Sequence, residues 1–497
     1  MNQAVPKPRF VLSALLVLLM GVAAPAFSQS PTEAQRIAEL AKVRDGLKSE
    51  AFRNADVVVV ISERAIADSV KQFVGTEITL ANGNVMKLSA IETQFVTGAA
   101  IIKIGVQAKS TNLQLTGRLS SGEVQNMPEG KKLRMPLQVT EVKLLNGGIS
   151  SLLIKTLFGA WLKPETWNDE LPALTLPLEI NEAMEIPAAQ FKVEGQMPME
   201  IVTAAYHAPL KLSLTSLLVL DKRAVVTLQV SSSGLPVNKP SSENVFSVED
   251  RISLENEVAQ LSGNTAAALA YEGDIRLRLS RNLISSLLSQ IAAQQNPDLK
   301  FKLKQSRVRS NEVNAVVSIV NYTDIEHGDG QADVSDLRVE NIADGKINVR
   351  LSGQGLIDAK IKGREYGIPY GFSPRTNFAI NNQPIPLQFV AENGRVMLQA
   401  VQGAALPINL RFTVQVAGRE IGIDRTEAVL VDRWLSRIEM PALLNREILL
   451  PNKLEIDAGG NLHVTGKRKL DYSLSNLRFG ANNDTVDITA DVKVNPK

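Results

Sequence analysis

The spacing of apolar residues changes early in the chain from a helical period to a period of two. After Ser62, a residue type typical of helix N-caps, apolar side chains recur at helical spacing as Ala65, Ile66, Ala67, Val70, Phe73 and Val74. This pattern predicts a helix that ends near Gly75. From about Lys87, and most clearly over 102–109 and 113–119, apolar and polar residues alternate. The alternation predicts antiparallel strands with one buried face.

The same succession of patterns starts again in the second part of the chain. Leu279-Ser280 parallels Ile61-Ser62, and the spacing that follows predicts a helix carrying Leu283, Ile284, Leu287, Leu288 and Ile291. Alternation over 347–361 and 396–416 predicts further strands. Doubled apolar residues at helical spacing predict one more helix in each part. Their residues are Leu153, Ile154, Leu157, Phe158, Trp161 and Leu162, and then Leu430, Val431, Trp434, Leu435 and Ile438.

A leading helix is predicted before the first of these series. Ser30-Pro31-Thr32-Glu33 has the form of a capping box with proline at the first helical position. Apolar residues then follow at helical spacing to about Glu50; they are Ile37, Leu40, Val43 and Leu47. Such a helix is either a cap on the first domain or a helix that binds a partner.

The closing strands of the two parts also resemble each other. Leucine and serine recur at matching places in 210–217 and 470–477. The separation of matching signals grows from about 218 residues at Ser62 and Ser280 to about 260 at Leu210 and Leu470, so the second copy would hold roughly 42 more residues. The shared order predicts an internal duplication. The alternative is one long β-rich fold whose patterns agree by chance.

Together the patterns predict an α+β, β-dominated fold: a duplicated module of curved antiparallel sheet wrapped on long apolar helices. The expected division has five parts. They are a signal peptide (1–28), an N-terminal helix (29–56), a first helix-plus-sheet module (57–235), a linker or connector (236–275) and a second helix-plus-sheet module (276–497).

The first 28 residues predict export. Lys7 and Arg9 precede an apolar run over 10–22, and Ala26-Phe27-Ser28 supplies small residues at a cleavage site. We expect a periplasmic protein cleaved near Ser28; the alternative is an uncleaved membrane anchor. The chain contains no cysteine, so it has neither disulfides nor thiolate metal sites.

The charge balance argues against a nucleic-acid partner. The chain has 54 Lys and Arg against 52 Asp and Glu, and removal of 1–28 takes away two bases and no acid. A neutral mature chain lacks the basic excess typical of nucleic-acid binders. The region 453–469 is mildly basic; it is either a peripheral contact with anionic membrane headgroups or an ordinary exposed hairpin.

Motifs for catalysis, cofactors and metals are absent from the sequence. There is no H-E-x-x-H pair, no G-x-S-x-G elbow and no phosphate-binding glycine loop. We therefore expect neither an enzyme nor a cofactor or metal site. The acidic stretch over 324–336, around Gly328 and Gly330, does not match a calcium loop and is predicted to be a solvated turn.

The order of elements resembles the tubular lipid-binding (TULIP) superfamily, which includes proteins of the bactericidal/permeability-increasing type. The resemblance is carried by residues 61–74 with the strands over 87–119, and by 279–291 with the strands after Lys300. It implies a groove between helix and sheet that accepts acyl chains. The neutral mature chain departs from the lipopolysaccharide-binding members, which are strongly basic at one tip, and it lacks the cysteine pair of the animal proteins.

Two functional hypotheses follow. The first is a binding protein for lipid or another apolar ligand, with a role in envelope lipid transport. The second is a non-enzymatic envelope scaffold that binds proteins through sheet edges or the leading helix. For the first, the candidate groove residues are Ile66, Val70, Phe73, Leu157, Trp161, Leu283, Leu287, Leu288 and Trp434. An apolar helical stripe more often belongs to a solid core than to a ligand cavity, so a filled interior is the alternative for each of these residues.

Overall fold

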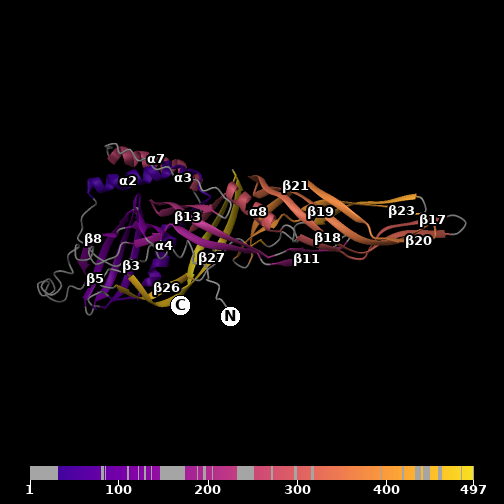
Figure 1. Ribbon diagram of the computed structural model, residues 1–497. Coiled ribbons are helices and arrows are strands. Elements are labelled where there is room, and N and C mark those ends of the chain that lie inside the picture. The colour runs from indigo at the N-terminus through magenta and orange to yellow at the C-terminus, as the bar shows by residue number, and fades with distance from the viewer. Residues whose placement is uncertain are drawn as a thin grey trace.

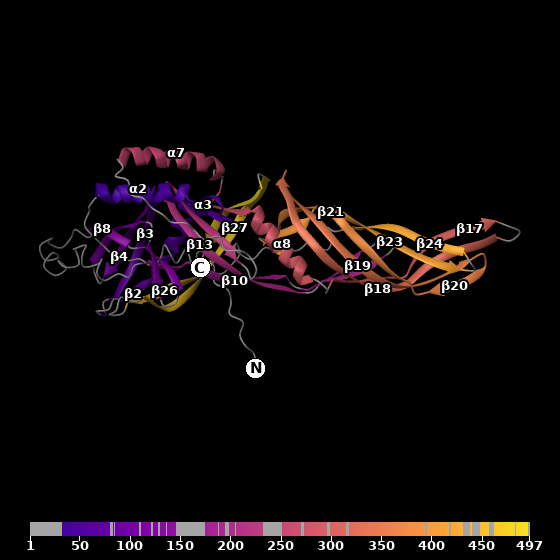
Figure 2. The ribbon, with the colours of Figure 1, turned by 45° about the horizontal axis from the view of Figure 1, so that its top comes forward.

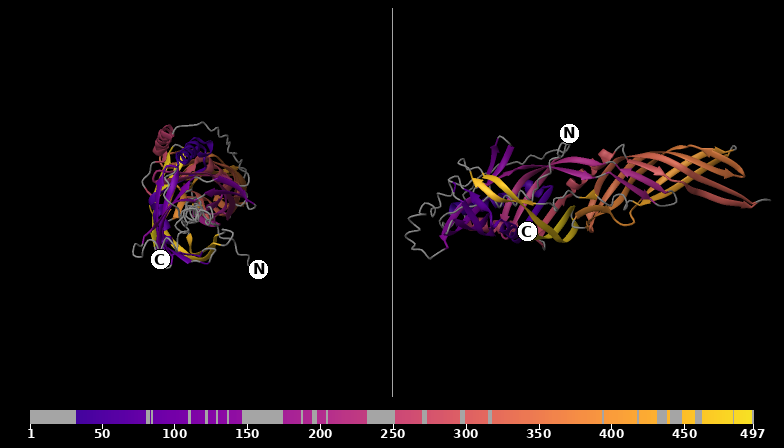
Figure 3. Two further views of the ribbon diagram at one scale, coloured as in Figure 1. Left: turned by 90° about the vertical axis from the view of Figure 1, so that its left-hand side faces the viewer. Right: turned by 90° about the horizontal axis from the view of Figure 1, so that it is seen from below.

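The computed structural model describes most of the chain after the leading segment. The described residues are 32–79, 83, 85–108, 111–120, 123–127, 130–135, 137–145, 174–186, 188–193, 198–203, 205–231, 251–269, 273–295, 299–314, 318–392, 395–416, 419–430, 438–439, 448–456, 462–482 and 484–495. The predicted signal peptide lies outside them. The molecule is long in one direction and narrow when seen end-on (Figures 1, 2 and 3).

The fold is β-dominated, as predicted, and its larger sheet has 13 strands in the described part of the chain. Their order is β10-β13-β14-β1-β15-β28-β27-β26-β2-β3-β4-β5-β8. The bounds are β1 Val57–Ser62, β2 Glu77–Thr79, β3 Val85–Val96, β4 Ala99–Ala108, β5 Thr111–Ser120, β8 Leu137–Leu144, β10 Glu179–Ile186, β13 Tyr206–Leu220, β14 Arg223–Ser231, β15 Ile275–Ser280, β26 Ile448–Ile456, β27 Leu462–Asn482 and β28 Thr485–Asn495. Its pairs are antiparallel except for β2 with β26.

The second sheet has ten strands among the described residues, and all its pairs are antiparallel. Its strands are β11 Ala189–Val193, β12 Met199–Thr203, β16 Leu299–Leu303, β17 Ser306–Asn314, β18 Ser318–Ala343, β19 Lys346–Glu365, β20 Ile368–Phe372, β21 Arg375–Glu392, β22 Arg395–Ala400 and β25 Ile438–Glu439. Two small sheets complete the strands: β23 Ala405–Val416 with β24 Arg419–Leu430, and β6 Glu123–Met127, β7 Gly130–Met135 and β9 Leu174–Pro177. Each large sheet takes strands from both predicted modules, because β11 and β12 pair into the second sheet and β26 to β28 into the first.

The described helices do not confirm the predicted long apolar helices on which the sheets would wrap. They are α2 Glu33–Lys48, α3 Glu50–Arg53, α4 Glu63–Val70 with the 3-10 turn η1 Lys71–Phe73, α7 Arg251–Leu269 and α8 Arg281–Gln295. The helix predicted over 153–162 lies outside the described residues. The helix predicted around Trp434 is wrong at both ends, because Leu430 closes β24 and Ile438 opens β25. Trp434 itself lies outside the described residues.

Strand β1 is buried on both faces, and this explains its unbroken apolar run. Val57, Val59 and Ile61 face the main apolar cluster of the molecule, whereas Val58 and Val60 face a smaller cluster on the opposite side of the sheet. Alternate side chains of a strand point to opposite faces, so a strand covered on both sides needs apolar residues throughout. The strands β4 and β5 have the predicted single buried face, with Ile104 opposite Leu115 and Val106 opposite Leu113.

The leading helix α2 covers the outer face of the first sheet (Figure 1). Its N-cap is Thr32, whose hydroxyl accepts from the Gln35 N–H, so the capping box begins two residues later than predicted. Three apolar side chains of the helix are buried: Leu40, Val43 and Leu47. Of the two predicted roles of the leading helix, the structure therefore supports the cap on the fold, and not a helix that is free to bind a partner.

A buried ion pair anchors α2 to the sheet. The Glu39 carboxylate accepts from Arg118 Nε at 2.7 Å and from Arg118 Nη2 at 2.6 Å, and both side chains are about nine-tenths buried. Arg36 adds a hydrogen bond from Nη1 to the Thr97 carbonyl at 2.6 Å. A two-point contact between guanidinium and carboxylate fixes orientation as well as position.

Helix α7 lies beside α2 and was missed in the sequence, where its residues were assigned to the connector. It buries only Leu254 and Val258 among its described side chains. Ion pairs join the two helices: Arg251 with Glu33 at 3.1 Å, Arg36 with Glu255 at 3.7 Å and Lys48 with Glu257. An apolar stripe this narrow gives little helical periodicity to detect.

The acidic stretch predicted to be a turn is instead the middle of β18, a strand of 26 residues. Its glycines allow close approach of neighbouring strands: a Cβ on Gly330 would lie 2.3 Å from Phe301 Cζ on β16. Its acids pair with basic side chains, Asp324 with Arg307 at 2.7 Å and Glu326 with Lys362 at 2.7 Å. The glycines serve packing here and not a change of chain direction.

Removing one partner of the buried ion pair should weaken the docking of α2. Glu39→Ala leaves the Arg118 guanidinium buried without its carboxylate, so we expect the free energy of unfolding to fall by about 3 kcal/mol. Glu33→Ala on the same helix removes an exposed pair and should cost less than about 1 kcal/mol. Urea unfolding of both variants measures the difference, and equal losses would contradict the role given to Glu39.

Candidate functional site

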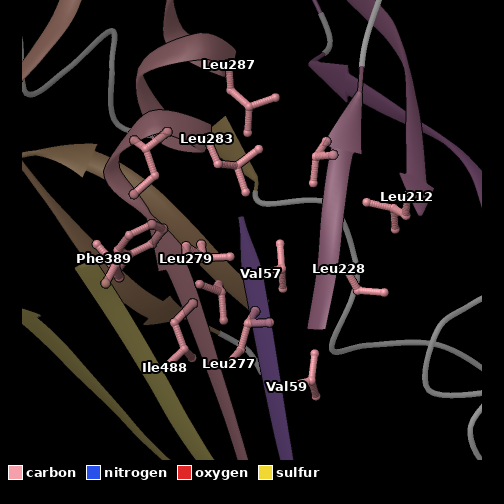
Figure 4. Close-up of a cluster of buried hydrophobic side chains, with 14 of the residues drawn as sticks. Val57, Val59, Leu212, Leu228, Leu277, Leu279, Leu283, Leu287, Phe389 and Ile488 are labelled. Atoms are coloured by element: carbon pink, nitrogen blue, oxygen red, sulfur yellow. The ribbon is translucent and has the colours of Figure 1, made fainter. Parts of the chain in front are cut away.

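One connected cluster of buried apolar side chains reaches both large sheets. Its part around α8 is drawn in Figure 4, where Leu283 and Leu287 lie between the helix and the β1–β15 strand pair. The labelled side chains come from six strands and one helix; they are Val57, Val59, Leu212, Leu228, Leu277, Leu279, Leu283, Leu287, Phe389 and Ile488. The cluster is the candidate site, because it is the largest apolar environment that the described residues form.

The structure brings six of the nine predicted groove residues into this cluster. Ile66, Val70 and Phe73 enter it from α4 and η1, and Leu283, Leu287 and Leu288 enter it from α8. Leu157, Trp161 and Trp434 lie outside the described residues. Burial places the six correctly at the interior, and their role in lining a groove stays a prediction.

Both helices are started by a serine at the end of a central strand, as predicted. The Ser62 hydroxyl accepts from the Ala65 N–H at 3.0 Å and begins α4. The Ser280 hydroxyl accepts from the Leu283 N–H at 3.2 Å and begins α8. Because β1 and β15 are antiparallel neighbours, the two helices leave the sheet from opposite ends of one strand pair.

The contacts around this strand pair are reciprocal. Ser62 N donates to the Asp274 carbonyl at 2.8 Å, and Ser280 N donates to the Asp56 carbonyl at 2.9 Å. The side chains are paired in the same reciprocal way: Ser62 Oγ donates to Asp274 Oδ1 at 2.8 Å, and Ser280 Oγ donates to Asp56 Oδ1 at 3.4 Å. An approximate twofold axis therefore passes between β1 and β15.

The next residues extend the correspondence to the neighbouring strands. Asp274 accepts from the Val492 N–H on β28 at 3.1 Å, and Asp56 accepts from the Val230 N–H on β14 at 3.0 Å. Sequence reasoning missed both aspartates. The available signal was their matching position in the sequence. Asp56 lies six residues before Ser62, and Asp274 lies six residues before Ser280.

The two aspartates differ in charge compensation. Arg64 contacts Asp274 through Nε at 2.9 Å and Nη2 at 2.8 Å, whereas the residue that matches Arg64 by position near Asp56 is Asn282. Burial alone would raise the pKa of Asp274, but hydrogen bonds from Arg64, Ser62 and Val492 outweigh it, so its pKa is lowered. For Asp56, burial dominates over the hydrogen bonds from Val230 and Ser280, and its pKa is raised.

The described residues contain no group of His, Asp and Glu arranged to hold a metal ion. Among the same residues, no helix is both long and apolar enough to cross a membrane. The polar contacts of Asp56 and Asp274 lie at the strand ends, and the apolar cluster between α8 and the sheet offers dispersion contacts.

Comparison with known proteins assigns no family. No family model matches the chain, and no curated protein matches it. Among solved structures, a crystal structure described as a lipopolysaccharide binding protein matches 88% of this chain and 99% of its own length, with 10% identity and a TM-score of 0.26. A likeness this loose fixes neither the family nor the ligand of this chain.

The two aspartates should respond in opposite ways to substitution. Asp274→Asn removes a carboxylate that is bonded in its charged form, so we expect a loss of about 1–2 kcal/mol at neutral pH. A lowered pKa means that this contribution is present at neutral pH and is lost as the pH falls through the folded-state value. Urea unfolding across a pH series measures it.

Asp56→Asn is the matched control from the other side of the axis. Its raised pKa means that the charged form opposes folding above that value, so wild-type stability from this site increases as the pH falls. At neutral pH we therefore expect Asp56→Asn to be neutral or stabilising. Equal destabilisation by both variants would contradict the charge asymmetry.

Proposed function

We propose that this is an exported, periplasmic protein that binds lipid or another apolar ligand in its interior, without catalysing a reaction, and that it takes part in moving lipid within the envelope. The observation that carries the proposal is the single apolar cluster shared by both sheets and by α4 and α8. The first 28 residues support export by their charge and apolar run.

The physical basis is hydrophobic transfer. Each CH₂ group removed from water contributes roughly 0.8 kcal/mol, so one long acyl chain supplies on the order of 10 kcal/mol before the costs of binding. Such a ligand needs no fixed set of polar side chains. This agrees with a sequence without catalytic motifs and with an interior lined by Leu, Ile, Val and Phe.

The alternative role is an envelope scaffold that binds proteins through sheet edges or the leading helix. The burial of Leu40, Val43 and Leu47 gives α2 less free apolar surface to offer a partner. A peripheral membrane contact through 453–469 stays a prediction; in this region Lys453 lies 3.8 Å from Glu77, with both side chains exposed. Binding in the interior is therefore the proposal that we favour.

We also propose that the two parts of the chain arose by duplication. The reciprocal bonds of Ser62 with Asp274 and of Ser280 with Asp56 support it. So do the matching turns before β14 and β28: the Glu63 N–H donates to the Lys222 carbonyl at 2.8 Å and the Arg281 N–H to the Asp484 carbonyl at 3.0 Å. A duplicated module would give the interior two helices with similar apolar faces.

Native mass spectrometry tests the proposal. The mature protein, purified from the periplasm without detergent, should carry phospholipid or fatty acid in stoichiometric amount, and solvent extraction should identify it. A clean unliganded mass that does not change after incubation with phospholipid vesicles would falsify interior lipid binding. Stoichiometric co-purification of another protein would favour the scaffold.

A larger side chain at the interior distinguishes a ligand space from a solid core. Leu287 points from α8 into the cluster, and in a filled core the extra volume of Leu287→Trp should cost about 1–3 kcal/mol. If a ligand occupies this region, the indole should replace it, with little loss of thermal stability but reduced lipid in the purified protein. Ala293→Trp on the exposed side of the same helix is the control.

A further inference from the structure

Helix α8 occupies the place of a strand along part of the edge of the second sheet. On that side, β18 pairs with β17 through residues 318–325 and with β16 through 328–332. Over 334–343, the described strands pair with β18 only on its other side, through β19. The wall of the second sheet is therefore continued there by a helix.

Side chains of α8 bond the backbone of this strand edge. Ser289 Oγ donates to the Leu337 carbonyl at 3.1 Å, and Arg281 Nη2 donates to the Val339 carbonyl at 3.2 Å. The Val339 N–H donates to Ser285 Oγ at 3.4 Å. Arg281, Ser285 and Ser289 are four residues apart, so they form one polar stripe along the helix.

The neighbouring stripes of α8 are apolar and face the interior. Leu283 and Leu287 form one of them, and Ile284 and Leu288 form the next; all four are buried in the main cluster. The helix thus separates the apolar interior from an edge that water reaches, since Ser289 is exposed. Displacing α8 from β18 would open the interior at this edge.

This part of the wall is held more weakly than the parts made of strands. A strand ladder supplies regularly spaced backbone bonds, as β18 forms with β19 along most of its length. The bonds described above between α8 and β18 all depend on side chains, and one of them comes from an exposed serine. Segments held by solvent-accessible side-chain hydrogen bonds open more readily than strand ladders.

When α8 moves away from β18 it loses apolar contacts, and contacts with an apolar ligand would replace them. Leu283 and Leu287 pack through non-directional dispersion and hydrophobic interactions, and an acyl chain offers the same kind of surface. The serine bonds can be replaced by water at the exposed edge. The Ser280 cap at the end of β15 and the bond from the Arg281 N–H to the Asp484 carbonyl keep the N-terminal end of α8 fixed.

We propose that α8 is the movable section of the wall, and that a single acyl chain reaches the interior between α8 and the edge of β18 at Leu337 and Val339. The inference rests on the proposed function, because it assigns the route to the same apolar interior. Uptake then requires the separation of Ser285 and Ser289 from β18.

Because the chain contains no cysteine, an engineered disulfide can fix α8 to β18 without competing thiols. Ser285 Oγ lies 3.4 Å from the Val339 nitrogen, so this is where helix and strand edge approach closely, and Ser285→Cys with Val339→Cys is the pair to cross-link, with disulfide formation checked by mass. The double variant is oxidised with diamide, and uptake of pyrene-labelled hexadecanoic acid is followed by fluorescence before and after reduction with dithiothreitol. The two single variants, treated identically, are the controls.

We expect the locked protein to take up the labelled fatty acid at least tenfold more slowly and to recover on reduction. A second variant, Ser285→Ala with Ser289→Ala, should take it up faster than wild type because two hydrogen bonds to the strand edge are removed. Equal uptake by the oxidised double variant, with the disulfide confirmed by mass, would overturn the route but leave the proposed function intact. A wild-type protein that binds no labelled fatty acid would overturn both.

Discussion

The antiparallel pairing of β1 with β15 is the constraint on which the rest of the structure depends. The pair lies inside the larger sheet, between β14 and β28, and it joins the two parts of the chain. Each strand ends in a serine that begins a helix, and each serine is held by an aspartate next to the partner strand. A shift of one residue in this register would separate both serines from their aspartates and turn the apolar faces of the strands around.

This pairing also determines where the apolar interior lies. Val57 and Val59 on β1 and Leu277 and Leu279 on β15 face the same side, and α8 returns over them. Because the strand pair starts both helices, α4 and α8 place their apolar stripes against one cluster. An interior built in this way is generic in chemistry, so under the proposed function the length and apolar surface of a ligand would decide its binding.

The parts of the fold that the sequence predicted well are those set by local chemistry. The caps at Ser62 and Ser280 and the alternation of β4 and β5 depend on residues close together in the chain. The errors have tertiary causes. The acidic stretch is strand because Phe301 and Leu303 on β16 pack on its glycines and Arg307, Lys360 and Lys362 pair with its acids. Helix α7 escaped notice because ion pairs with α2 replace much of the apolar stripe. For the site, the stripes of α4 and α8 were visible, whereas Asp56 and Asp274 acquire their role only when distant strands meet.

The central claim is that an apolar ligand occupies the interior between α8 and the β1–β15 pair. Photolabelling of the mature protein with a diazirine-bearing fatty acid, followed by peptide mapping, tests it most directly. We expect labels on α8 around Leu283 and Leu287 and on the inward residues of β1 and β15. Labels confined to the outer helices α2 and α7, or a protein that takes no label, would contradict it.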